Sequence, residues 1–108
     1  HQGIMISIDF FAAPGALTGF SARGHADTAP YGEDIVCAAV SSACLLTANT
    51  ITEVLHLPAA AEMKDGFLQL RLSGDTAPAQ VLLQGLKLHL SALSEQYPQS
   101  IQVLISEV

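Results

Sequence analysis

His25 and Cys37 are the two residues of this 108-residue chain whose types and spacing best match a chemical site. The sequence predicts His25 at the end of a strand and Cys37 in the first turn of a helix. A helix N-terminus carries about half a positive charge, which favours a thiolate over a thiol. The intervening loop contains a proline and a glycine, so it can bring the imidazole near the sulfur; its residues are Asp27, Thr28, Ala29, Pro30, Tyr31 and Gly32. A thiol, a base and a helix N-terminus are the parts of a cysteine nucleophile.

The same two residues also have a purely structural interpretation. A single cysteine in an alanine-rich helix often serves as a small core residue. A histidine before a loop often lies at the surface. Spacing alone therefore leaves the catalytic and the structural interpretation of Cys37 and His25 open.

Two neighbours of Cys37 are candidates for supporting the site. Asp34 precedes Cys37 by three residues, so it lies one turn back on the same side of the helix. It either orients His25 or caps the helix, and the cap is favoured because Asp is among the commonest N-cap residues. Ser41 lies one turn beyond Cys37, and its hydroxyl bonds either near the thiol or back to a helix carbonyl.

The sequence predicts neither a metal nor another cofactor. A zinc site needs three or four converging ligands, and the available residues lack the usual Cys-x-x-Cys or His-x-x-x-His spacings; these residues are His25, Cys37, Cys44, His56 and His89. We expect Cys44 in the core and the last two histidines at a helix surface or end. No glycine-rich phosphate loop is found in the sequence.

The segment from residue 24 to residue 41 is specific enough to suggest a family. It contains Gly24-His25-Ala26, then Gly32, then Asp34-Ile35-Val36-Cys37-Ala38-Ala39-Val40-Ser41. This pattern resembles, without departure, the signature of the ribosomal-processing cysteine protease family (Prp). Outside these residues the resemblance rests on chain length and on the order of elements.

The resemblance implies a cysteine endopeptidase with a Cys-His dyad. Cys37 would attack the scissile carbonyl, and His25 would act as general base and then as general acid. Backbone N–H groups at the helix start would form the oxyanion hole. Members of the family remove a short N-terminal extension, which ends in a hydrophobic, Phe-containing motif, from large-subunit ribosomal protein twenty-seven. The resemblance also implies a homodimer. We expect residues 27–32 to move as a flap over the bound peptide.

Composition narrows the class of protein and of partner. Half of the residues are apolar and 13% are charged, which excludes a disordered chain. The net charge of -6, with four Lys and Arg in total, argues against direct nucleic-acid binding and suits a basic protein partner. We expect one protease domain over residues 4–108, with residues 1–3 left from an expression tag.

The cysteines indicate a cellular compartment. Cys37 and Cys44 share one predicted helix, and seven residues separate their Cα atoms by about 10 Å, too far for a disulfide. Two free thiols and no signal peptide predict a cytoplasmic protein. The longest apolar run, Ala38 to Leu46, is too short to span a bilayer, so we expect no membrane partner.

Hydrophobic periodicity predicts an α/β (α+β) two-layer sandwich, with two helices on one face of a mostly antiparallel sheet. The predicted order is β-β-α-β-β-α-β: strands 4–12 and 17–25, helix 33–56, strands 59–65 and 66–73, a helix from about residue 77 to Tyr97, and strand 101–107. We expect the first helix to be buried on more than one face. We expect Asp65-Gly66 to form a type I′ turn, and Ile101, Val103 and Ile105 to share one face of the last strand.

A different class of function is also compatible with this sequence. The chain could be a non-catalytic homodimeric module that binds ribosomal protein or assembly intermediates. The apolar first helix would then serve the dimer interface, with Cys37 packed inside it. Thiol reactivity separates the two hypotheses, because a catalytic thiolate alkylates readily and a buried structural thiol does not.

Overall fold

The computed structural model describes residues 5–24 and 31–107, and for residues 31–34 it describes the backbone alone. The predicted element order is confirmed, with a π-helical turn after the first helix and a 3-10 turn before the second. The elements are β1 (Ile6–Ala13), β2 (Ala16–Arg23), α1 (Tyr31–Asn49), η1 (Thr50–Val54), β3 (Ala59–Lys64), β4 (Phe67–Leu72), η2 (Ala77–Ala79), α2 (Gln80–Gln96) and β5 (Ile101–Glu107).

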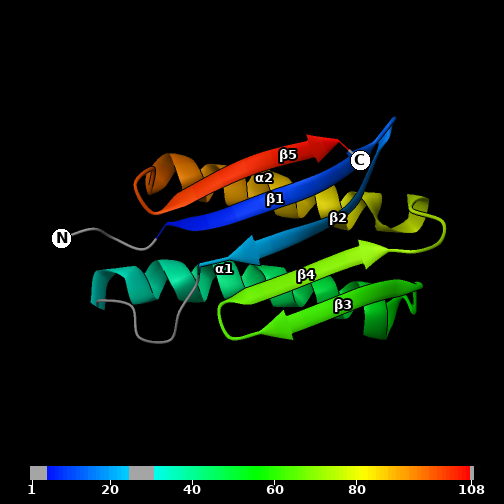
Figure 1. The fold of residues 1–108 in the computed structure, drawn as a ribbon, viewed down its shortest axis with the longest axis horizontal. Helices are drawn as coiled ribbons and strands as arrows, with labels where there is room; N and C mark the ends of the chain where they lie inside the picture. The colour runs from blue at the N-terminus through cyan, green and yellow to red at the C-terminus, as the bar shows by residue number, and fades with distance from the viewer. Residues whose placement is uncertain (1–4, 25–30, 108) are drawn as a thin grey trace.

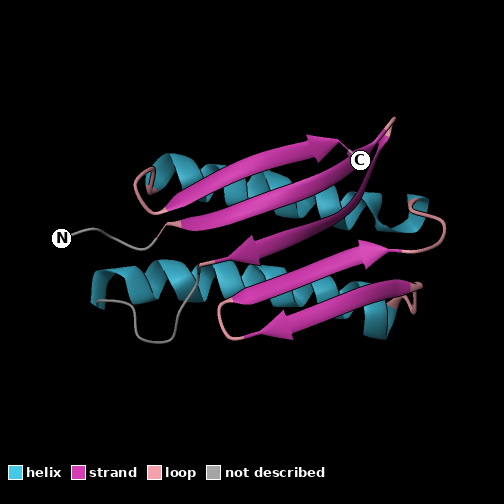
Figure 2. Ribbon diagram, viewed as in Figure 1, coloured by secondary structure: helices cyan, strands magenta, loops and turns pink. Residues whose placement is uncertain are grey.

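The five strands form one sheet in the order β3-β4-β2-β1-β5. Three of the strand pairs are antiparallel, and β5 pairs parallel to β1. Both helices lie on the same face of this sheet (Figures 1 and 2). The predicted two-layer sandwich with a mostly antiparallel sheet is therefore confirmed.

The hydrophobic core lies between the sheet and the two helices. Alternate residues of the strands point into it, as the period-two pattern predicts. From the helices, every third or fourth residue points toward the sheet. The largest fully buried side chains are Phe10, Phe20, Ile6, Ile8, Ile51, Leu70, Leu83, Leu90 and Ile101.

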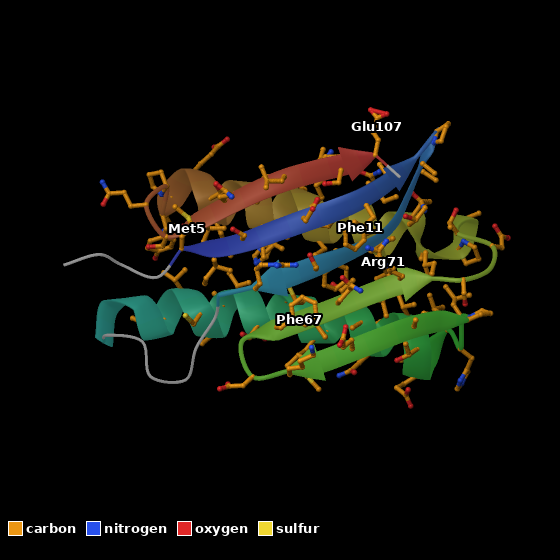
Figure 3. All side chains as sticks on the ribbon, in the orientation of Figure 1. Met5, Phe11, Phe67, Arg71 and Glu107 are labelled. Atoms are coloured by element: carbon orange, nitrogen blue, oxygen red, sulfur yellow. The ribbon has the colours of Figure 1, made fainter. Side chains whose placement is uncertain are left out.

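The opposite face of the sheet has no helix over it and is held by side-chain contacts across the strands. Arg71 on β4 lies with its guanidinium carbon 3.9 Å from the centroid of the Phe11 ring on β1 (Figure 3). Gly19 of β2 lies between their strands, opposite both residues. Because Gly19 has no side chain, Arg71 can reach across it and cover Phe11, which is buried.

The turn between β3 and β4 differs in type from the prediction. The Asp65-Gly66 turn joins β3 to β4, but positive φ occurs at Gly66 alone, so the turn is not of type I′. A positive φ strains any residue with a Cβ, and here glycine alone adopts it. Outside glycine, among the described residues, His56 is the one with positive φ, 53°, at the end of the first helical segment.

The first helix differs from the prediction at both ends. It begins at Tyr31 rather than near Glu33, and its regular α-helical part ends at Asn49 rather than near His56. The last turn is π-helical. There the side-chain hydroxyls of Thr50 and Thr52 each donate to the carbonyl four residues earlier, a competing bond that often bends a helix.

The prediction that the first helix is buried on several faces is wrong for this chain by itself. Its side toward the sheet is buried through Val36, Val40 and Cys44. Its other sides leave Ile35 and Leu46 exposed, because the sheet covers a helix from one direction. The helix therefore carries apolar surface that the fold does not use.

Length and composition alone would allow the first helix to cross a membrane. The helical segment Ile35–Val54 has 20 residues and a mean hydropathy of 1.7. It is longer than the apolar run Ala38 to Leu46 on which the sequence prediction rests. A core helix of a water-soluble domain passes the same test. In this fold its buried side packs on the sheet, where it contributes Ile51 and Ala48 to the core.

In the last strand Ile101, Val103 and Ile105 pair with Ile6, Ile8 and Phe10 of β1 and share one face, as predicted. Ile101 is buried and Val103 is half-buried, but Ile105 is exposed. The core cluster takes in Ile101 and Val103 and does not reach Ile105. Alternation alone cannot tell where along a strand the covering layer ends.

Candidate active site

Cys37 lies on the side of α1 that faces the sheet. Its side chain is 8% exposed and belongs to the core cluster together with Val36 and Val40. Because α1 begins at Tyr31, Cys37 is the seventh residue of the helix and lies in its second turn, not in the first. The field of a helix terminus weakens within the first turn, so it acts on Cys37 less than the sequence predicted.

The start of α1 at Tyr31 also changes which backbone N–H groups could form the oxyanion hole. The backbone N–H groups without a partner in the helix are those of its first four residues, 31–34. The nearest of them lies three residues before Cys37, about 4.5 Å along the helix axis. Donation to an oxyanion at Cys37 therefore requires a peptide that lies back over the first turn.

Asp34 is the fourth residue of α1. The prediction that it caps the helix is wrong, because an N-cap residue precedes the first helical residue. It remains one turn before Cys37, and an acidic residue in the first turn stabilises the positive helix end. Its side chain lies outside the described part of the chain.

His25 and residues 27–30 lie outside the described residues. The structure therefore gives no distance between the imidazole of His25 and the sulfur of Cys37. Tyr31 and Gly32, which the sequence places in the loop, have helical backbone instead. The role of residues 27–32 in binding the substrate stays a prediction.

Gly24 fixes the point from which the chain enters residue 25. Its φ is +95°, and a Cβ there would lie 2.5 Å from the carbonyl oxygen of Met5. The backbone therefore approaches Met5 too closely at this position for any residue with a side chain. The Gly24 N–H also donates to the carbonyl oxygen of Gly66 at 3.0 Å. The residue before His25 is therefore tied to the start of β1 and to the β3–β4 turn.

The second cysteine is a core residue, as predicted. Cys44 is 1% exposed, and burial raises the pKa of its thiol from 9.0 to about 12. A thiol that stays protonated at neutral pH is a poor nucleophile. Both cysteines are free thiols. Ser41, half-buried, lies between them on the same helix.

Metal ligands do not gather in the described ranges 5–24 and 31–107, where no three His, Cys, Asp or Glu side chains are close enough to hold an ion. His56 and His89 are exposed, at a helix end and on α2, as expected.

The structure adds a cavity that the sequence did not reveal. It has a volume of about 310 Å³ and lies between α1 and the β3–β4 hairpin. Its lining consists of Ala22, Ser41, Cys44, Leu45, Met63, Lys64, Asp65, Gly66 and Leu68. The Asp65-Gly66 turn was recognisable in the sequence, but nothing there told against which helix the turn would pack.

A two-layer α/β domain with a cysteine on its long first helix, and with a histidine between the preceding strand and that helix in the sequence, has the parts of a small cysteine peptidase. The sequence profile of the cysteine protease Prp family matches residues 5–102, so the chain belongs to that family. The match extends well beyond the segment 24–41 that first indicated it. No curated protein matches the sequence at a significant level.

Solved structures show the same fold. SMU.848 from Streptococcus mutans is 28% identical, with a TM-score of 0.86, and the match covers 96% of this chain and 99% of that chain. The ribosomal processing protease Prp from S. aureus, in complex with a substrate peptide, is 26% identical with a TM-score of 0.85 over 94% of this chain and 100% of that chain. The same S. aureus protease with a covalently linked product peptide is 28% identical, with a TM-score of 0.82, and the match covers 94% of this chain and 100% of that chain.

Proposed function

We propose that this protein is a cysteine endopeptidase that removes the N-terminal extension of ribosomal protein twenty-seven of the large subunit. The observation that carries the proposal is the likeness to the S. aureus ribosomal processing protease, which was solved both with a substrate peptide and with a covalently linked product peptide. That likeness extends over 94% of this chain and 100% of that one. A covalent product is what a nucleophilic thiol forms.

In the proposed reaction the Cys37 sulfur attacks the scissile carbonyl carbon. His25 takes the thiol proton, and the tetrahedral intermediate collapses to a thioester while His25 gives that proton to the leaving amine. Water then attacks the thioester, with His25 again as base, and releases the carboxylate product and the thiol. Asp34 and Ser41 are supporting candidates at one turn on either side of Cys37.

The depth of Cys37 sets a condition on this reaction. Cys37 as a whole residue is 8% exposed, so little of its surface is open to a peptide carbonyl. We propose that the site opens as the peptide binds and that residues 27–32 then close over the peptide as a flap and exclude water.

The charge of the protein suits this substrate. The chain carries ten acidic and four basic residues, a net charge of -6. Ribosomal proteins that pack against RNA are basic, and opposite net charges increase the association rate at low ionic strength. Direct binding of nucleic acid to such a chain is disfavoured by the same charge.

We further propose a homodimer formed through the helical layer. The groove between α1 and α2 has a volume of about 520 Å³ and is mostly apolar. Leu46 of α1 and Val81 of α2 line it and are exposed in the isolated chain. A second copy of the chain would bury these exposed apolar side chains. Two free thiols also fit a reducing cytoplasm.

The burial of Cys37 also favours a second candidate function, a non-catalytic module that binds ribosomal protein. In that case Cys37 would be a packing residue and would not form a covalent adduct with a peptide. Trapping of a thioester or an alkylated Cys37 distinguishes the protease from the module.

The direct test is incubation with the N-terminally extended ribosomal protein, followed by mass spectrometry. We expect one new N-terminus at a single bond. The Cys37→Ala variant should leave the substrate whole. Cleavage by Cys37→Ala at the wild-type rate, or no cleavage by the folded wild type, would remove the endopeptidase proposal.

A further inference from the structure

The end of β2 lies directly before His25 in the chain, and backbone contacts hold it on two sides. The Gly24 N–H donates to the carbonyl oxygen of Gly66 in the β3–β4 turn at 3.0 Å. Toward β1, the Gly24 backbone lies so close to Met5 that a Cβ would stand 2.5 Å from the Met5 carbonyl oxygen. In Figure 1 the arrowhead of β2 and the β3–β4 turn lie side by side. The position from which the chain enters residue 25 is therefore set by both neighbouring strands.

Arg23, the last residue of β2, adds a side-chain contact to the same hairpin. It pairs with Phe67, the first residue of β4. The guanidinium carbon of Arg23 lies 5.4 Å from the centroid of the Phe67 ring, and the Nζ of Lys64 lies 5.7 Å from it. A cation within about 6 Å of the centroid of an aromatic ring is attracted to the ring. One ring thus links the ends of β2 and β3 to the start of β4 (Figure 3).

This contact lies on the face of the sheet that the helices do not cover. Leu68 and Leu70 of β4 are buried in the core, so Phe67 points to the opposite face, together with its partner Arg23. Arg23 is exposed. Because neither helix packs on that face, contacts across the strands are what order the Arg23 side chain and the strand end that carries it.

The strength of the contact sets the size of its effect. An exposed cation–ring contact changes a conformational equilibrium by a factor of about two to five. A general base acts only within hydrogen-bond reach of the proton that it takes, and a displaced catalytic group slows the reaction. Loss of the contact should therefore reduce the fraction of molecules in which the proposed base is correctly placed.

We propose that Arg23 and Phe67 are positioning residues for the proposed reaction. Their contact holds the end of β2, so that the chain enters His25 in one direction. The inference rests on the proposed function, since it takes His25 as the base. Both residues act through His25 and not on the peptide.

Arg71 and Phe11 supply a matched control on the same face of the sheet. The guanidinium carbon of Arg71 lies 3.9 Å from the centroid of the Phe11 ring. Both residues are opposite Gly19, four residues before Arg23 and about 13 Å from it along β2. Arg23→Gln and Arg71→Gln each remove one positive charge and one cation–ring contact. An effect of charge or of general stability appears in both variants, whereas an effect on His25 appears in Arg23→Gln alone.

The test measures kcat and KM for one peptide substrate, at a temperature at which circular dichroism shows every variant folded. We expect Arg23→Gln to lower kcat about two- to fivefold with little change in KM. Arg71→Gln should keep the wild-type kcat. Arg23→Lys, which keeps a cation at this position, should restore most of kcat. Wild-type kcat in Arg23→Gln, or equal losses in the two Gln variants, would overturn the positioning role and leave the endopeptidase standing.

The ring is tested from its own side. Phe67→Leu should lower kcat at least as much as Arg23→Gln, and Phe67→Tyr should keep it because the aromatic ring remains. The double variant with Arg23→Gln and Phe67→Leu should lose no more than Phe67→Leu, because residues in contact are not independent. Additive losses would contradict a role for the contact between Arg23 and Phe67.

A measurement that needs no cleavage separates this inference from the proposed function. In the Cys44→Ala background, alkylation of Cys37 by iodoacetamide at pH 7 follows its thiolate fraction, which a nearby imidazolium raises. If the wild type cleaves no peptide, the endopeptidase proposal fails and this alkylation rate decides the positioning role. A two- to fivefold slower rate in Arg23→Gln, with recovery in Arg23→Lys and no change in Arg71→Gln, would support it. Equal rates in all of them would overturn it.

Discussion

The two cysteines should differ strongly in reactivity, and the structure gives the magnitude for one of them. Burial raises the pKa of the Cys44 thiol to about 12. At pH 8 about one molecule in ten thousand would carry the Cys44 thiolate, against about one in ten for a thiol at the ordinary value of 9.0. Thiolate fraction alone therefore slows alkylation of Cys44 about a thousandfold.

The chain has two cysteines, so a variant that lacks one of them reports on the other alone. The mass of the intact protein then measures the labelling, and no proteolytic digestion is needed to assign it. Cys44→Ala carries only Cys37, and Cys37→Ala carries only Cys44. Each is treated with iodoacetamide from pH 6 to pH 9, and the intact mass is followed over time. We expect Cys37 to be modified within this pH range and Cys44 to stay unmodified at pH 8. In denaturant both should react at the same rate.

Two outcomes would refute parts of this reasoning. Rapid labelling of Cys44 in the folded protein would show that the core around it opens and that its burial does not protect it. Resistance of Cys37 at every pH at which the protein stays folded would favour the non-catalytic module, because a nucleophile must be reachable and deprotonated.

Four further measurements follow. Cys37→Ala and His25→Ala should each abolish peptide cleavage and leave the fold intact, and Cys37→Ser should be nearly inactive. Cys44→Ala should keep most of the activity. Cleavage at the wild-type rate by Cys37→Ala or by His25→Ala would contradict the dyad. The free energy of unfolding should fall at high pH, because the raised pKa of Cys44 means that the folded state holds the thiol proton more tightly than the unfolded state. This contribution to stability is complete below pH 9 and is lost as the pH rises toward 12. The loss is up to about 4 kcal/mol for a pKa difference of three units. Chemical denaturation at pH 8 and pH 11 measures this, and Cys44→Ala should lack the Cys44 share of the loss. Light scattering should give twice the chain mass of 11.3 kDa at micromolar concentration, with Leu46→Glu shifting the protein toward the monomer; a wild-type mass near 11.3 kDa rules out the dimer. A non-cleavable peptide should slow amide hydrogen exchange in residues 27–32 more than elsewhere, and equal exchange with and without a peptide shown to bind argues against the flap.

The sequence alone determined the local features of this protein. The alternation of Ile6, Ile8 and Phe10 predicts a half-buried strand in any register, because successive side chains of a strand point to opposite faces. The segment 24–41 identifies the family, since the order of its residues is itself the signature. The core position of Cys44 follows from its place in the apolar part of the helix. These features depend on neighbours in sequence.

The tertiary structure decided the features that depend on what packs where. It placed the start of α1 at Tyr31, which moved Cys37 into the second turn and Asp34 into the helix. It left Ile105 exposed, because the core reaches only part of β5. It also brought the Asp65-Gly66 turn close to α1, with a cavity lined by both. Hydrophobic periodicity predicts none of these three features. A hydrophobic pattern shows which face of a helix or strand is apolar, but it does not show which distant segment covers that face or how far along the element the covering segment extends.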